Sequence, residues 1–531
     1  MRRREYSVVA VVCLGVCISA GRIAAQAPAA PLRQVAYLKA SNPEAYDHFG
    51  EGGALPSHTG QTVAMSGDGN TIAVGAPHEA SSATGMNGNQ SDNATYNGGA
   101  VYVYTRNGGT WQQQAYVKAS NVGSGDYFGS SVGLSADGNT MAVAANWEAS
   151  SATGVNGNQA DNSIPQAGAV YIFTRSGGTW RQQAYLKASN TGEAGETGDG
   201  DQFGFSLSLS DDGNTVAVGA IAEDSNANGI NGNQADNSAN SAGAVYVFAR
   251  TGSTWAQQAY VKSSTPAEYA NGDLFGFSIA LNANGNTLAV GAYDEGGSAR
   301  GINGTIDNMR GGSGAVYVFT RAAGTWSRQA YLKTATAEQG DSWGVSLTIS
   351  DDGNTLAVGS VDEDCTATGV NPPGCDTDVK TDVSTGAVAL FVRAGTTWSQ
   401  QAYLKSSNTD TEDWFGIRTA LSGDGDTLAV TASNEDSAAQ GLNGNQADNS
   451  ATESGSVYFF TRSGTTWAQQ AYVKSSNNQA YDEFGNSVAL SRNGRTMAVG
   501  ARGEDSNARG VNGNQADNSV DEAGAAYVFT R

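Results

Sequence analysis

The chain has 531 residues, 70 of them glycine, and a formal net charge of −22 at pH 7. This acidic balance argues against nucleic acid as a partner, because a phosphate backbone is bound by basic surfaces. Apolar residues make up 39% of the sequence, or about 52% with glycine included, a value typical of globular rather than disordered proteins.

The first 25 residues have the features of a secretory signal peptide. A basic head precedes an apolar stretch from Val8 to Ala20, and small residues lead to an expected cleavage after Ala25. The apolar stretch is too short to span a bilayer, and no later stretch is long enough. We therefore expect a secreted protein with no membrane span, located outside the cell, on its surface or in the periplasm. Removing residues 1–25 takes away four arginines and one glutamate, which moves the net charge from −22 to −25.

Residues 201–262 contain one copy of a unit that recurs along the rest of the chain. The unit has four strand-like runs bounded by Gly, Asn, Asp and Ser, namely FGFSLSLS, TVAVGA, AVYVFAR and TWAQQAYVK. Asp212-Gly213-Asn214 predicts a tight hairpin between the first two runs, and a long polar stretch, Glu223–Ser241, separates the second from the third. The aromatic–glycine pair that opens the unit occurs seven times, at intervals of 68 to 79 residues. Each interval is long enough for a four-stranded sheet with one long loop. The pairs are Phe49-Gly50, Phe128-Gly129, Phe203-Gly204, Phe275-Gly276, Trp343-Gly344, Phe415-Gly416 and Phe484-Gly485.

The strands of each unit become bulkier from first to last. Small residues such as Ala and Gly are frequent in TVAVGA, whereas the last two runs contain Tyr, Phe and Trp. This gradient favours wedge-shaped blades around an axis, because the later strands must fill a widening gap. The segment Val35–Lys39 looks like a surplus fourth strand, and the chain ends on a third strand with no fourth after it. After a short linker over residues 26–34, we predict an all-β fold for residues 35–531. It is a seven-bladed β-propeller of four-stranded antiparallel blades, in which the N-terminal strand pairs with Ala525–Thr530 and completes the last blade.

The Phe-Gly opening and the Gly-Ala that follows the second run resemble the FG-GAP repeat of integrin alpha-chain propellers. The first copy reads Gly75-Ala76-Pro77. The likeness covers essentially all of the mature chain, looks closest to bacterial secreted FG-GAP repeat proteins, and implies a seven-bladed propeller with an extracellular binding role. Integrin-type propellers bind calcium in the hairpin between the first two strands. Here that hairpin is only SADGNT or SDDGNT, which offers too few oxygens for calcium.

The long polar stretches share a strict register. We expect them on the same face of the ring as the connections between blades, and we expect ligands on this long-loop face, because the opposite face carries only tight turns. In all seven copies a glutamate precedes an asparagine by eight residues, and in five copies the asparagine opens the motif NGNQxDN. Carboxylate and amide oxygens at this spacing suit Ca²⁺. The candidate ligands are Glu79, Asn87, Asn89, Asp92, Glu148, Asn156, Asn158, Asp161, Glu223, Asn231, Asn233, Asp236, Glu435, Asn443, Asn445, Asp448, Glu504, Asn512, Asn514 and Asp517.

A second interpretation of the motif needs no metal, because Asn, Asp and Gly also form turns that satisfy their own hydrogen bonds. In copy five, Cys365 and Cys375 stand where most other copies have the motif. In an exported protein these cysteines are expected to form a disulfide. A covalent bridge at this place suggests that the role of the motif is to fix the conformation of the loop. The sequence leaves both interpretations open, with Ca²⁺ as the one expected cofactor.

The three histidines, His48, His58 and His78, all occur in the first copy, which alone carries the insert EGGALPSHTG. A zinc or catalytic site there is an alternative to plain surface decoration, although no other copy contributes a histidine. The main prediction is a monomeric, non-enzymatic binding or adhesion module whose ligand is an extracellular protein or glycan. The alternatives are an extracellular hydrolase or lyase that degrades a polymer and uses these histidines, and a structural surface-layer protein.

Overall fold

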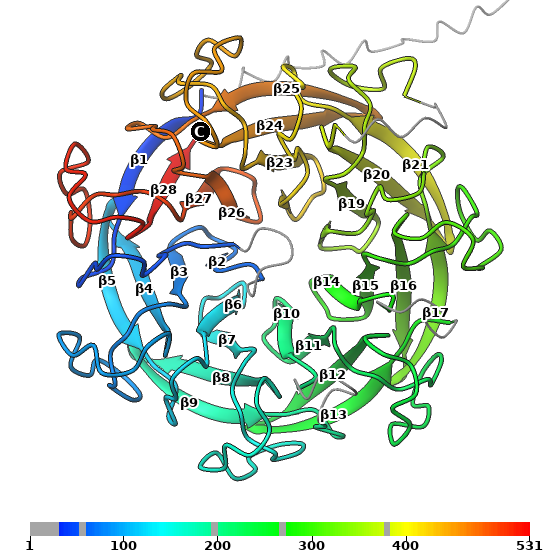
Figure 1. Cartoon of the computed structure of the whole chain (residues 1–531), viewed down its shortest axis with the longest axis horizontal. Helices are drawn as coiled ribbons and strands as arrows, with labels where there is room; N and C mark the ends of the chain where they lie inside the picture. The colour runs from blue at the N-terminus through cyan, green and yellow to red at the C-terminus, as the bar shows by residue number, and fades with distance from the viewer. Residues whose placement is uncertain (1–30, 53–59, 193–199, 265–271, 376–382) are drawn as a thin grey trace, which may run out of the picture.

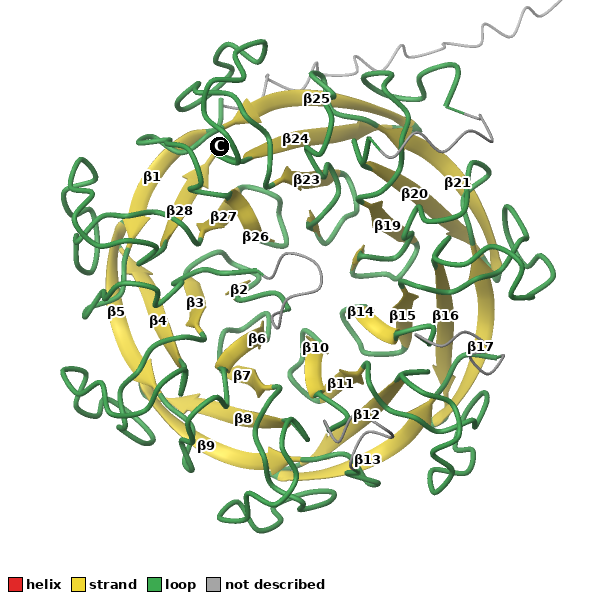
Figure 2. Cartoon of the chain, in the orientation of Figure 1, coloured by secondary structure: helices red, strands yellow, loops and turns green. Residues whose placement is uncertain are grey.

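The chain folds into a ring of seven β-sheets around a central axis (Figures 1 and 2). The structure is a computed structural model that describes residues 31–52, 60–192, 200–264, 272–375 and 383–531. Within these ranges every sheet has four antiparallel strands, which confirms the predicted seven-bladed all-β propeller. A helix able to cross a bilayer is not found among the described residues.

Six blades add their strands in chain order from the axis to the rim, and in the last blade β1 takes the place of the outermost strand (Figure 1). The first three blades are β2 (Val63–Met65), β3 (Thr71–Ala76), β4 (Ala100–Asn107), β5 (Thr110–Val117); β6 (Phe128–Leu134), β7 (Thr140–Ala145), β8 (Ala169–Ser176), β9 (Thr179–Leu186); and β10 (Phe203–Leu209), β11 (Thr215–Ala220), β12 (Ala244–Thr251), β13 (Thr254–Val261). The next three are β14 (Phe275–Leu281), β15 (Thr287–Ala292), β16 (Ala315–Ala322), β17 (Thr325–Leu332); β18 (Ser346–Ile349), β19 (Thr355–Ser360), β20 (Ala387–Ala394), β21 (Thr397–Leu404); and β22 (Thr419–Leu421), β23 (Thr427–Ala432), β24 (Ser456–Ser463), β25 (Thr466–Val473). The last is β26 (Phe484–Leu490), β27 (Thr496–Ala501), β28 (Ala525–Thr530) and β1 (Arg33–Leu38).

The N-terminal strand closes the ring. β1 pairs antiparallel with β28, from Arg33 opposite Thr530 to Leu38 opposite Ala526, and lies outside it at the rim (Figure 1). This confirms the predicted pairing of the two chain ends. Because β28 then has a partner on both sides, the last blade presents no unpaired edge at its third strand.

Tryptophans at the start of the outer strands link neighbouring blades. Trp180 is 3% exposed, and the guanidinium of Arg175 lies 5.2 Å from its ring centroid. The indole Nε1–H of Trp180 donates to Gln114 of the preceding blade at 3.0 Å. The same Arg–Trp stacking recurs at Trp111, Trp255, Trp326, Trp398 and Trp467. The bulky residues therefore lie at the rim, as the sequence gradient predicts.

The tight turns of the opposite face form a closed ring of backbone hydrogen bonds around the axis. One residue per blade donates its N–H to the carbonyl of the next blade at 2.8 to 3.3 Å, and the seventh returns to the first. The side chain of Arg492 crosses this ring and forms ion pairs with Asp211, at 2.7 Å, and with Asp351. The residues of the ring are, in order, Gly67, Ala136, Asp211, Ala283, Asp351, Gly423 and Arg492.

A buried ion pair in every blade holds the long loop against the outer strand. The lysine directly after the outer strand contacts the loop glutamate at 2.6 to 3.1 Å, and both side chains are at most 6% exposed. In blade three Tyr260 also donates its hydroxyl to Glu223 at 2.7 Å. Burial lowers the pKa of Lys262 despite the attraction of Glu223. The pairs are Lys118–Glu79, Lys187–Glu148, Lys262–Glu223, Lys333–Glu295, Lys405–Glu363, Lys474–Glu435 and Lys39–Glu504.

Breaking one such pair should destabilise the protein strongly. Lys262→Met leaves the Glu223 carboxylate buried without its cation, which costs about 3–5 kcal/mol of unfolding free energy. The double variant Lys262→Met/Glu223→Gln removes both charges and should recover most of this loss. Denaturant unfolding of the wild type, the single and the double variant measures both effects. A single variant as stable as the double variant would contradict the role of the pair.

Candidate functional site

The first two candidate calcium ligands of each long loop join the loop to its outer strand. The glutamate is the anion of the buried ion pair described above. The asparagine eight residues later adopts a positive φ, 57° at Asn156, and its Oδ1 accepts the backbone N–H of Tyr185 at 3.0 Å. Equivalent bonds are made by Asn87, Asn231, Asn303, Asn371, Asn443 and Asn512. The glutamate and the asparagine, eight residues apart, thus attach the long loop to the same outer strand at two points.

The other two candidate ligands form turns inside the loop. In the second copy, Asn158 Oδ1 accepts the N–H of Ala160 and Asp161 Oδ1 accepts that of Ser163, each at 3.1 Å. The same turns occur at Asn89, Asp92, Asn233, Asp236, Asn445, Asp448, Asn514 and Asp517. These contacts are the ones that the metal-free interpretation requires, whereas Ca²⁺ at these loops stays a prediction.

The long loop of copy five contains the predicted disulfide. Cys365 and Cys375 are bonded, with their Cα atoms 5.1 Å apart. Asn371, which lies between them in sequence, keeps the bond from its Oδ1 to the outer strand, at Tyr403 N, at 2.8 Å. The bridge therefore fixes a loop that lacks the NGNQxDN motif but retains the shared anchor.

A buried aspartate lies near each Lys–Glu pair, two residues before the aromatic that opens the copy. Asp201 is 4% exposed and accepts the backbone N–H of Gly192 at 3.2 Å. Burial, strengthened by the charge of Glu223, raises the pKa of Asp201 to about 8. Burial likewise raises the pKa to about 6 at Asp126, to about 7 at Asp273, Asp341 and Asp413, and to about 8 at Asp47 and Asp482. When the aspartate is protonated, the lysine and the glutamate of the ion pair are the two remaining charges in each buried cluster.

The copies also differ where the innermost strands meet the long-loop face. The variable positions are the residues on either side of the aromatic–glycine pair and the two residues before the loop glutamate. We call the residues at these positions the axial mouth. Its apolar side consists of Phe205, Phe277, Tyr293, Val345, Val361, Trp414 and Ile417. Its charged side consists of His48, Glu51, His78, Glu483 and Arg502. Tyr127 and Trp147 lie beside the charged side.

The apolar side is a cluster contributed by neighbouring copies. Val345, Val361 and Ile417 are buried, and the half-buried rings of Phe277, Tyr293 and Trp414 pack against them. The rings of Phe277 and Tyr293 stack with centroids 4.7 Å apart. Half-buried aromatic rings beside a buried apolar base are typical of ligand contacts.

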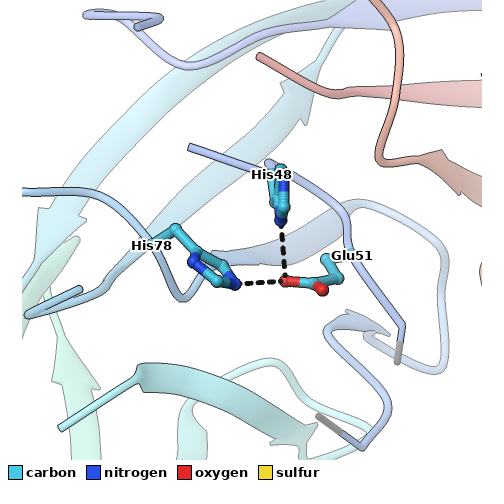
Figure 3. Close-up of side chains that lie close together, drawn as sticks. All are labelled: His48, Glu51 and His78. Carbon is cyan, nitrogen blue, oxygen red and sulfur yellow. Dashed lines mark ion pairs between the residues drawn. The ribbon is translucent and has the colours of Figure 1, made fainter. Parts of the chain in front are cut away.

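The charged side joins the first copy to the last. Glu51 Oε2 lies 3.4 Å from His48 Nδ1 and 3.2 Å from His78 Nε2, so both imidazoles face one carboxylate (Figure 3). Its Oε1 lies 3.6 Å from Arg502, which also pairs with Glu483 of the last copy. Burial alone would raise the pKa of Glu51, but the contacts with His48 and His78 lower it. Burial alone would lower the pKa of His48, but the contact with Glu51 has the larger effect, and the pKa of His48 is raised.

Sequence reasoning identified part of this site. His48 and His78 come together, whereas His58 lies outside the described residues. Glu51 and Arg502 were missed because each occupies a position that other copies fill with apolar residues such as Phe205 and Ile221. A charged residue at such a position, within otherwise repeating strands, was the available signal. Trp147, directly before the loop glutamate of copy two, is half-buried, and its ring centroid lies 4.9 Å from that of Tyr127.

Comparison with protein families matches residues 111–173 and 467–529 to the FG-GAP repeat. The protein is a seven-bladed propeller with FG-GAP repeats. Each matched stretch of the FG-GAP propeller runs from the tryptophan of one outer strand to the third strand of the next blade. The repeat is therefore offset from the blade by one strand, in agreement with the closure of the last blade by β1. A search of curated proteins finds no match to the chain.

Solved structures similar to the FG-GAP propeller share little of its sequence. The periplasmic gluconolactonase of Pseudomonas aeruginosa is 14% identical, with 85% of this chain and 98% of that chain covered and a TM-score of 0.44. Hydrazine synthase of Kuenenia stuttgartiensis is 12% identical, with coverage of 84% and 96% and a TM-score of 0.43. The Swd1 β-propeller domain of Myceliophteria thermophila is 8% identical, with coverage of 94% and 100% and a TM-score of 0.45.

The buried aspartates predict that the FG-GAP propeller becomes less stable as the pH rises. Folding raises the pKa of Asp201 from 3.8 to about 8, so between these values the folded state binds more protons than the unfolded state. The stability that this proton contributes is complete below about pH 4 and is lost as the pH rises through about 8. We expect the melting temperature to fall between pH 5 and pH 8.5. Asp201→Asn should make this fall shallower, whereas the loop variant Asp448→Asn should leave it unchanged.

Calcium in the long loops can be tested by melting. Binding of Ca²⁺ to even a few loops of the folded state predicts a melting temperature several degrees higher in Ca²⁺ than in chelator, because a ligand of the folded state alone stabilises it. Asn231→Ala/Asp236→Ala would reduce the difference by removing two candidate ligands of one loop. Identical curves in the two buffers would contradict calcium at these sites.

Proposed function

We propose that the protein is a secreted, non-enzymatic binding or adhesion module that takes an extracellular protein or glycan ligand on its long-loop face. The axial mouth carries this proposal. Strands, ion pairs and loop anchors repeat from copy to copy, whereas the residues at the mouth differ from one copy to the next. A mouth with aromatic rings on one side and charges on the other supplies both kinds of contact that ligand sites combine.

Secretion is supported by two separate features. Residues 1–25 have the composition of a signal peptide, although they lie outside the described residues. The Cys365–Cys375 disulfide belongs to an oxidising compartment, since thiols are kept reduced in the cytosol. An acidic surface favours neutral or basic ligands over nucleic acid.

A hydrolase or lyase acting on an extracellular polymer is the second candidate. His48, Glu51 and His78 favour it, because imidazole and carboxylate groups at hydrogen-bonding distance can move protons. Turnover of a polymer by the wild type, lost in Glu51→Gln, would support this candidate, whereas saturable binding without turnover supports the binding module.

Truncation of an aromatic at the mouth should weaken ligand binding. Trp414→Ala removes a half-buried ring from the apolar side, and aromatic hot spots of this kind contribute about 2 kcal/mol or more, roughly 30-fold in affinity. The measurement is binding of the labelled mature protein to arrays of extracellular glycans and matrix proteins, followed by titration of each hit. Tyr96→Ala, at a loop tyrosine that is 73% exposed, is the control and should bind like the wild type. Loss of binding in Tyr96→Ala with Trp414→Ala unaffected would contradict a site at the mouth.

A further inference from the structure

We propose that His48, Glu51 and His78 bind one divalent transition-metal ion of the zinc class at the axial mouth. The proposal stands independently of the ligand binding proposed above. In the part of the chain that the structure describes, these side chains form the one group of three His, Cys, Asp or Glu residues whose donor atoms all lie within 4.8 Å of one another. Two imidazole nitrogens and one carboxylate oxygen suit zinc, and imidazole does not suit Ca²⁺.

The distances between the donor atoms fit tetrahedral coordination. Zinc–ligand bonds of about 2.0–2.1 Å place neighbouring ligand atoms about 3.3–3.4 Å apart. Glu51 Oε2 lies 3.4 Å from His48 Nδ1 and 3.2 Å from His78 Nε2 (Figure 3). A small closing movement of the two imidazoles, whose facing nitrogens lie within 4.8 Å, would complete the third edge.

The far nitrogen of each imidazole lies against an oxygen acceptor. His48 Nε2 is 2.9 Å from Glu522 Oε2, and His78 Nδ1 is 3.2 Å from Asn97 Oδ1. A neutral imidazole that donates from its far nitrogen directs a lone pair from its near nitrogen. Two such lone pairs and a carboxylate oxygen repel one another unless the facing nitrogens are protonated or a metal cation lies between them. Oxygen acceptors behind the histidines are the usual surroundings of protein-bound zinc.

Glu51 supplies a second, independent observation. Its side chain is 4% exposed, and among the described residues no donor makes a hydrogen bond of suitable geometry to Oε2. Arg502 faces the other oxygen, at 3.6 Å. A buried carboxylate oxygen without a hydrogen bond costs free energy, and a cation bound at Oε2 would remove that cost.

The site would leave one coordination position open toward the mouth. The side chains of His48 and His78 are 12% and 20% exposed, so water or an atom of a ligand can reach the ion. The same ion would also tie the first copy to the last, because Glu522 belongs to the long loop before β28. Metal binding should therefore stabilise the ring where its two ends meet.

The experiment is a titration of the mature protein, produced without a histidine tag and freed of metal with a chelator. Calorimetry with Zn²⁺ should give one equivalent per chain, and Co²⁺ should give the visible absorption of a four- or five-coordinate site. Zn²⁺ should also raise the melting temperature of the wild type. Substitution of a residue that hydrogen-bonds to a metal ligand typically lowers metal affinity about 10–100-fold, and we expect a loss in this range for Glu522→Gln. His78→Ala removes a ligand itself and should lower the affinity by more than about 100-fold.

Asp294→Ala is the matched control, because Asp294 occupies in copy four the position of His78 in copy one. It should keep the stoichiometry and affinity of the wild type. Circular dichroism of the metal-free variants checks that they are folded. No Zn²⁺ binding by the wild type would overturn the proposal. Binding that survives both His78→Ala and Glu51→Gln would overturn it as well, since surface carboxylates would then hold the metal.

Discussion

The buried lysine–glutamate pair is the interaction on which the working surface of the molecule depends. It joins the end of each outer strand to the start of each long loop, at 2.6 to 3.1 Å in all seven blades. A desolvated pair of this kind adds little net stability over an apolar pair, but it tolerates few alternative arrangements. The asparagine eight residues on adds a second anchor on the same strand, as Asn231 does at Tyr260. Long polar loops, which would otherwise have many conformations, are held in the same place seven times.

Repetition and variation are thus separated in space. The rim and the loops repeat, with arginine over tryptophan in six blades and an ion pair in all seven. The axial mouth does not repeat, and it changes from stacked aromatic rings at Phe277 and Tyr293 to a histidine–carboxylate cluster at Glu51. A scaffold of this kind can change its specificity at the mouth without changing its frame.

Much of the fold could be predicted from the sequence because its signals are local and occur seven times. The strand runs, the aromatic–glycine pairs and the unmatched strands at Val35–Lys39 and Ala525–Thr530 fix the blade count and the closure. The partners of the loop glutamates could not be predicted in this way. In the sequence, Glu223 looks like a cation ligand because other side chains with oxygen atoms follow it. Only the packing shows that Lys262, 39 residues later, is its partner. The cluster at Glu51 was hidden for the opposite reason. It occurs once, and its partners Arg502 and Glu522 come from the last copy.

The pairing of β1 with β28 also affects how the molecule can be assembled. β1 is the first strand of the ring in chain order and pairs with β28, the last, so the final blade cannot form until all the strands of the ring have been synthesised. Contacts between such distant segments form slowly, because a long loop must close before they are gained. Until then the aromatic face of Tyr37, which ends fully buried, remains uncovered. A chain that stops early would keep this apolar strand exposed, a feature by which cellular chaperones and proteases could distinguish unfinished copies from complete ones.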